Sequence, residues 1–179
     1  YEWFLRIVIA LVIVSFGLLS LTDTFGAQDT PHGVPLAWIS RIATVTFMIY
    51  YTVLDGIGGI GLGRQLIVVK ELVDVGSLTA VEAERVGFFL DRMWVDPWVG
   101  GIGSFVSLTG SWAVFVAAVS AAGYLRLNRR ASWLACVLLL GFGWELQVAH
   151  ASYHGPIAFS LLALASVLLL TRKNAGAAG

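Results

Sequence analysis

Charged residues are scarce in this chain, and residues that bind metals or form disulfides are scarcer. Of 179 residues, 12% are charged, three are histidine and one is cysteine. The single Cys136 excludes an internal disulfide and a cysteine-based metal site, and its apolar surroundings in the sequence predict a small core residue. The net charge is zero and no long run of Lys and Arg is present, so we do not expect nucleic acid as a partner.

Known catalytic patterns are missing as well. The chain contains no GxSxG, Walker, HExxH or CxxC pattern, and we therefore do not expect an enzyme. It also has no internal repeat and no inverted duplication of the kind that organises many transporters. A complete transporter in one chain is therefore not the leading expectation.

Hydrophobic residues, by contrast, make up 58% of the chain, and the mean hydropathy is +0.85. This composition predicts an all-α, polytopic bundle of transmembrane helices that forms a single membrane domain over residues 1–179. A helix needs about 20 mostly apolar residues to cross the hydrocarbon of a bilayer. About five segments qualify, at residues 3–21, 36–62, 98–125, 131–149 and 156–170. The last is short, so it must extend into its flanks, tilt little or cross a thinned region.

Tryptophans support the boundaries of these spans. Trp3, Trp38, Trp98 and Trp133 each lie at the start of a predicted span. Tryptophan rings are enriched where a membrane helix meets the headgroups. We therefore predict that these four side chains are interfacial anchors.

The segment 63–97 is the only sizeable polar region, with four of the eleven basic and six of the eleven acidic residues. Thr79 and Glu82 have the spacing of a capping box, and apolar residues then recur at helical spacing. A second helix is predicted before Gly76 and Ser77. We interpret the segment as an interfacial helical hairpin that packs on the bundle or docks a partner.

Basic residues, which concentrate on the cytoplasmic side of a membrane protein, do not orient this bundle. With five crossings and the amino end inside, five basic residues fall inside and six outside. Individual loops favour an even number of crossings, because 22–35 has no basic residue whereas 126–130 and 172–173 are basic. A sixth crossing would use 63–97, where each charge facing lipid costs roughly 2.5 to 3.5 kcal/mol. We therefore predict five crossings.

Two acidic residues, Asp55 and Glu145, lie within predicted spans. Intramembrane acids are expensive and often functional. In the five-span arrangement their helices run parallel and the two acids lie at comparable depth, so they can share a proton or a cation. In a six-span arrangement they fall in opposite leaflets. The alternative is two separate structural acids that bond to nearby backbone, Tyr or Trp groups.

Five glycines follow Asp55 in the stretch DGIGGIGLG. Gly59 and Gly63 form a GxxxG pair, and such small residues let helices approach closely, so we predict helix packing at Gly56, Gly59 and Gly63. The alternative is an unwound segment whose carbonyl oxygens bind an ion.

Histidines at the end of the fourth span form a weak candidate metal site. His150 and His154 are four residues apart and would share one face of a continued helix. Glu145 or His32 would have to join them, and Gly155 with the following proline predicts that the helix ends here. Histidines that bond water or headgroups at the interface are the alternative. No cofactor is predicted, with metal or haem kept only as a weak possibility.

These features favour an accessory or structural subunit of a larger bacterial membrane protein assembly. The expected partners are the lipid bilayer and either other membrane subunits or further copies of the chain. Arg outnumbers Lys, and Ala, Gly and Val are abundant, which is typical of a GC-rich bacterial genome. Together with the predicted spans, this favours a multi-pass protein of the inner membrane. One alternative is a small proton- or cation-coupled carrier or channel that uses Asp55 and Glu145. The other is a metal- or haem-binding redox protein.

Overall fold

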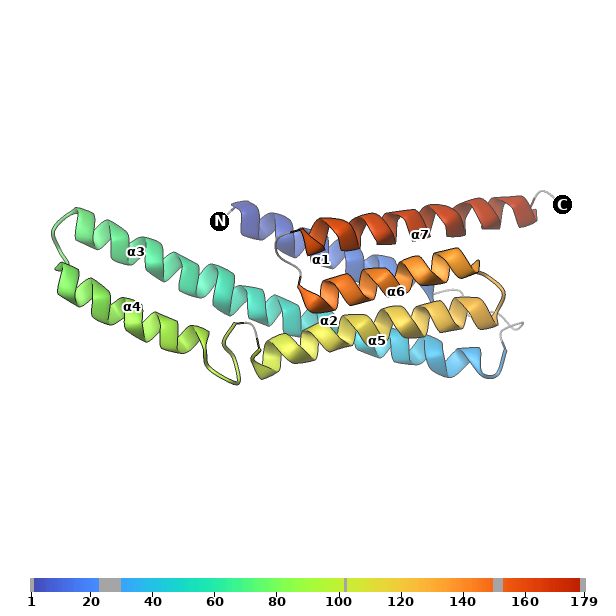
Figure 1. Ribbon diagram of the computed structural model, residues 1–179, viewed down its shortest axis with the longest axis horizontal. Helices are drawn as coiled ribbons and strands as arrows, with labels where there is room; N and C mark the ends of the chain where they lie inside the picture. The colour runs from blue at the N-terminus through green and yellow to red at the C-terminus, as the bar shows by residue number, and fades with distance from the viewer. Residues whose placement is uncertain (1, 23–29, 102, 150–152, 178–179) are drawn as a thin grey trace. The chain divides into compact units, whose positions relative to one another are not determined.

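A computed structural model describes residues 2–22, 30–101, 103–149 and 153–177 of the chain (Figure 1). These residues are helical and contain no strand, which confirms the prediction of an all-α fold. The helices are α1 (Glu2–Leu21), α2 (Gly33–Leu54), α3 (Gly63–Asp74), α4 (Ala80–Trp94), α5 (Phe105–Leu127), α6 (Trp133–Val148) and α7 (His154–Ala177), with a π-helical segment η1 (Asp55–Leu62) between α2 and α3.

Among the described residues, three helices are long and apolar enough to cross a membrane. They are the run Gly33–Asp74 of 42 residues, Phe105–Leu127 of 23 residues and His154–Arg172 of 19 residues. Ile9–Leu21 and Trp133–Val148 are shorter apolar helices. This composition fits a membrane protein, and the count of five crossings stays a prediction.

Two helices, α7 and α5, differ clearly from the predicted spans. The last helix begins at His154 and continues to Ala177, so the short span 156–170 is extended at both ends. The helix predicted from residue 98 begins only at Phe105, because the preceding residues form a turn with its own backbone hydrogen bonds. In that turn the carbonyl oxygen of Pro97 accepts from the amide of Phe105 at 2.8 Å.

The chain divides into two compact units, and the division falls within α1, α2 and α5. Tyr1–Ala10 and Ile49–Gly110 form what we call the hairpin unit, while Leu11–Met48 and Ser111–Gly179 form the core unit. The prediction of one domain over residues 1–179 stays a prediction.

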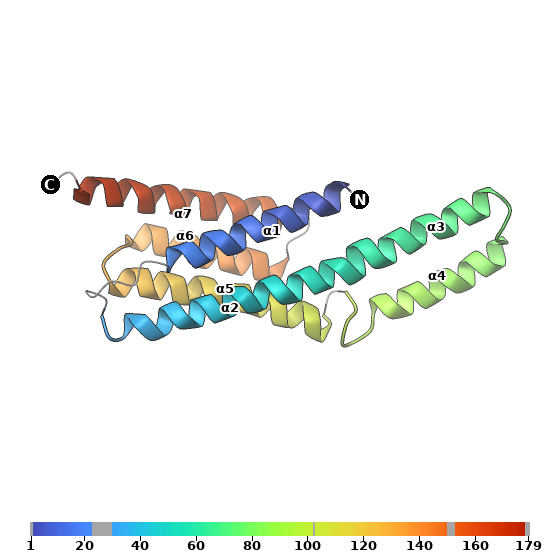
Figure 2. The ribbon, with the colours of Figure 1, turned by 180° about the vertical axis from the view of Figure 1, so that it is seen from behind.

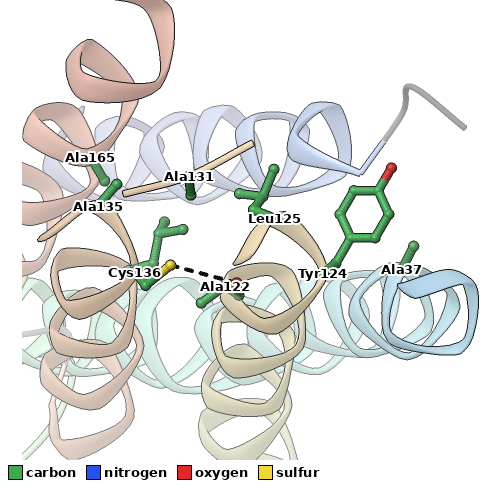
Figure 3. Close-up of a cluster of buried hydrophobic side chains, with 9 residues drawn as sticks. Ala37, Ala122, Tyr124, Leu125, Ala131, Ala135, Cys136 and Ala165 are labelled. Carbon is green, nitrogen blue, oxygen red and sulfur yellow. Dashed lines mark hydrogen bonds between the residues drawn. The ribbon is translucent and has the colours of Figure 1, made fainter. Parts of the chain in front are cut away.

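Small residues build the centre of the core unit. Figure 3 shows a cluster of buried side chains from α2, α5, α6, α7 and the α5–α6 connection. Alanine recurs in it because a single methyl group lets helix backbones approach closely. The cluster contains Ala37, Ala122, Tyr124, Leu125, Ala131, Ala135, Cys136, Leu139 and Ala165. Cys136 is free and 4% exposed, and its Sγ lies 3.7 Å from the carbonyl oxygen of Ala122, so the prediction of a small core residue is confirmed.

Helices α3 and α4 of the hairpin unit lie side by side and antiparallel in both views (Figures 1 and 2). The amide of Ser77 donates to the carbonyl oxygen of Leu72 at 2.9 Å, and Gly76 has a φ of 71°, which is the usual way to end a helix on a glycine. The predicted break at Gly76 and Ser77 is confirmed.

The predicted capping box at the start of α4 is also confirmed. The Thr79 hydroxyl oxygen accepts from the Glu82 amide at 3.3 Å, and the Glu82 Oε2 accepts from the Thr79 amide at 2.9 Å. The hydroxyl and the amide of Thr79 stabilise the ionised carboxylate, so they lower the pKa of Glu82. The turn between α3 and α4 is therefore fixed at both ends by local hydrogen bonds.

Candidate functional site

Asp55 is the acid that the structure buries most clearly within an apolar helix. Its side chain is 7% exposed, and it is the first residue of η1. A π-helix closes its backbone hydrogen bonds over five residues instead of four, and such segments are frequently found at functional sites. The four glycines of η1 lower the local preference for the α-helix, which explains why the irregular segment lies here. The helical run nonetheless continues into α3 without interruption.

Buried polar side chains lie at the same level of the hairpin unit. Tyr51, one turn before Asp55, is 2% exposed. A Cβ built on Gly110 of α5 would lie 2.6 Å from the Tyr51 ring, so α5 is in close contact with α2 there. Because α2 and α5 run antiparallel (Figures 1 and 2), this contact places Ser107, one turn before Gly110, at the level of Asp55. A carboxylate, a phenol and a hydroxyl group therefore come from two neighbouring helices.

The Trp94 ring packs against η1 at Gly58. A Cβ on Gly58 would lie 2.7 Å from Cζ3 of the Trp94 ring, and a Cβ on Gly101 would overlap the same ring. The indole thus lies in a slot between two glycines that are 43 residues apart in the sequence. Trp94 is not predictable as a site residue from the sequence, because nothing in the local pattern links the last residue of α4 to a glycine of η1.

The three glycines predicted to pack behave differently from Gly58. Gly56 and Gly63 have no atom within 4 Å of where a Cβ would stand, and Gly59 is exposed. Within the described part of the chain, close packing in η1 therefore falls on Gly58. A role for Gly56, Gly59 and Gly63 against another chain stays a prediction.

Glu145, the other intramembrane candidate, pairs with a histidine. Its Oε2 lies 2.8 Å from Nδ1 of His154, and the Tyr153 ring stacks on the His154 ring with centroids 4.2 Å apart. This contact joins the end of α6 to the beginning of α7, two helices that pack along each other. Glu145 thus has a structural partner in the core unit. A site that it shares with Asp55 remains a prediction.

This arrangement brings together only two of the predicted metal ligands. Glu145 and His154 are two of the four predicted candidates and lie in contact, whereas His150 lies outside the described residues. His32 is exposed at the start of α2. Within the described residues, no group of three His, Cys, Asp or Glu side chains is arranged to hold a metal ion.

The predicted tryptophan anchors are exposed where the structure describes their side chains. Trp38, Trp98 and Trp133 are 54%, 67% and 68% exposed. The Arg126 guanidinium lies 4.6 Å from the Trp133 ring, which is a favourable cation–π arrangement. The Trp3 side chain lies outside the described residues.

Comparisons with known proteins give this chain no relatives from which a role could be transferred. No protein-family model, no curated protein and no solved structure matches it significantly. The proposals that follow therefore rest on the chain's own contacts, burial and charges.

Proposed function

We propose that the chain is a non-catalytic, multi-pass subunit of a larger protein assembly in a bacterial inner membrane. Five helical crossings, including α1 and α6, hold it in the bilayer, and the α3–α4 hairpin contacts the partner. One observation carries this proposal: the hairpin lies beyond the apolar part of a 42-residue helix and leaves large apolar side chains exposed.

The length of that helix argues that α3 lies outside the hydrocarbon. About 20 residues suffice for a crossing, and the apolar residues of α2 and η1 supply that number. The following segment 63–97 carries ten charged residues, which would be costly in lipid. Yet Leu66 and Val73, seven residues apart on α3, are 52% and 37% exposed. Exposed apolar rows on a polar helix mark a protein-binding surface.

Affinity purification of the tagged full chain from its native membrane in mild detergent tests the proposal. We expect another membrane protein to be recovered in fixed stoichiometry. The double variant Leu66→Glu and Val73→Glu should lower that recovery about tenfold, because two buried carboxylates would be unpaired at the contact. Gln65→Glu, which adds one carboxylate to a different flank of α3, is the control for added negative charge on this helix. The proposal would be contradicted if the wild-type chain were always recovered with no other membrane protein.

A second function, a proton or cation pathway through Asp55, is favoured by its burial at the start of η1. Tyr51 precedes Asp55 by one turn, and Ser107 of α5 lies at the same level, so oxygen-bearing side chains from two helices come together in the hairpin unit. The π-helical turn adds carbonyl oxygens that depart from regular α-helical bonding.

Asp55→Asn tests this second function because it keeps the shape of the side chain and removes the ionisable proton. We expect proton or cation flux in liposomes to fall at least tenfold, while Asp55→Glu keeps a measurable part. Glu145→Gln shows whether the second intramembrane acid takes part, since unchanged flux in this variant would leave transport to Asp55 alone. Unchanged flux in Asp55→Asn would exclude Asp55 from transport.

A further inference from the structure

Helix α4 carries an exposed apolar stripe that α3 does not cover. Val81, Phe88 and Val95 are spaced by seven residues and are 59%, 68% and 65% exposed. Seven residues are almost two helical turns, so the three side chains lie in one nearly straight row. The opposite side of α4 is the packed one, since Leu90 is 3% exposed and Ala83 and Val86 are half-buried. We call the row of three the α4 stripe.

Charges of opposite sign flank the α4 stripe. Arg85 and Arg92 lie three residues before and four residues after Phe88, which puts both on one flank of the row. Glu84 and Asp91 lie four residues before and three residues after Phe88, which puts both on the other flank. All four side chains are exposed, and none makes an ion pair within residues 2–22, 30–101, 103–149 and 153–177.

We infer that the α4 stripe pairs with the α4 stripe of a second copy of this chain in a parallel, two-fold arrangement. Rotation about an axis along the helix brings Phe88 against Phe88 of the second copy. It also brings the arginine flank of each copy against the acidic flank of the other. Arg85 of one copy then faces Glu84 of the other, and Arg92 faces Asp91. The two members of each pair are offset by one residue along the helix. An antiparallel pair would place arginine against arginine.

The membrane imposes the same symmetry. This step rests on the proposed role as a membrane subunit, because two copies inserted in one orientation are related by an axis along the membrane normal. In that role α3 continues the spanning helix without interruption and α4 is antiparallel to α3, so α4 also follows this axis and runs parallel to its equivalent in the second copy. The alternative cover, an anionic lipid surface, is disfavoured because segment 63–97 has six acidic and four basic residues.

Single cysteines introduced at the stripe test the pairing in the full chain reconstituted in liposomes. In a parallel pair each residue meets its own copy, so Val81→Cys, Phe88→Cys and Val95→Cys should all form disulfide dimers under a mild oxidant. Val75→Cys is the matched control, because Val75 is 73% exposed but lies in the α3–α4 turn. The wild-type chain is the second control, since its Cys136 is buried. Dimers from Phe88→Cys alone would show antiparallel pairing, and no stripe-specific dimer would refute pairing; either result overturns the inference.

Charge exchange tests the register. In the Phe88→Cys chain, Arg85→Glu with Arg92→Glu makes both flanks acidic, and Glu84→Arg with Asp91→Arg makes both basic, so either variant alone should form about tenfold less disulfide dimer. Mixing the two variants should restore cross-linking between them, which also shows that both are folded. Equal cross-linking in all mixtures would overturn the inference.

These outcomes separate the pairing from the proposed function. If the stripe does not cross-link but another membrane protein is still recovered with the chain, the pairing is wrong and the role as a subunit stands. If the stripe cross-links and the chain is recovered only with itself, the pairing is right and the role in a larger assembly is wrong.

Discussion

Replacing Gly143 of α6 with alanine should destabilise the core unit despite the better helix preference of alanine. A Cβ at this position would lie 2.6 Å from the Cβ of Ala118 on α5 and 3.4 Å from the Cα of Phe115. Neither atom belongs to the flexible end of a side chain, so the two helices must separate. Overpacking of this kind costs about 1–3 kcal/mol, against a gain of roughly 0.5–1 kcal/mol in helix preference. We expect the thermal unfolding midpoint in detergent to fall by several degrees.

A reciprocal exchange distinguishes this contact from a general effect of the substitution. Gly143→Ala combined with Ala118→Gly moves the methyl group from α5 to α6 and should recover most of the loss. Gly17→Ala is the matched control, because no atom lies within 4 Å of a Cβ there, and it should leave the midpoint unchanged or raise it. Equal midpoints for Gly143→Ala and Gly17→Ala would show that α5 and α6 are not in this contact.

The helices were predictable from the sequence because their signals are local. Apolar runs locate α1, α2, α5, α6 and α7, and the Thr79–Glu82 pair gives the start of α4. The sequence places the start of α5 seven residues too early, since the amides of Gly100 and Gly101 bond back to the carbonyl oxygens of Asp96 and Trp94 in a turn. Hydropathy alone does not predict which carbonyl oxygen accepts the hydrogen bond of a given backbone amide.

The features that define the candidate site depend on contacts between distant residues. The position of Asp55 in a span predicts its burial, whereas the π-helical form of the glycine run is not predictable, because such a run is equally compatible with a packing seam and with an unwound segment. Trp94 lies in its slot through Gly58 and Gly101, and only a folded hairpin brings these together. The sequence predicts Glu145 only as a further ligand in a metal site with the histidines. In the structure, Glu145 contacts His154 directly.

Gly100, in the turn from α4 to α5, should tolerate an added methyl group very poorly. A Cβ on Gly100 would overlap the Trp94 carbonyl oxygen and lie 2.5 and 2.7 Å from the carbonyl oxygen and amide nitrogen of Asp96. These are backbone atoms of a turn in which the Gly101 amide donates to the same Trp94 oxygen at 2.6 Å. No side-chain rotation can relieve the overlap.

The same turn contains a stabilised acid. The side-chain oxygen of Asp96 accepts from the amides of Trp98 and Val99, each at 2.9 Å, and these bonds lower the pKa of Asp96. Displacement of Gly100 would therefore break several hydrogen bonds of the turn rather than a single contact.

We expect Gly100→Ala to cost about 3 kcal/mol, the upper end of what overpacking costs. The loss should be local, because Trp94 would leave Gly58 and α4 would detach from η1 before the rest of the chain unfolds. Limited trypsin digestion should then cleave after Arg92 at least tenfold faster than in the wild-type chain. Gly87→Ala, in α4 with no atom within 4 Å of a Cβ, should keep the wild-type rate. If both variants were cleaved alike, the glycine turn would not be what holds α4 against η1, and the slot for Trp94 would have to be rigid for another reason.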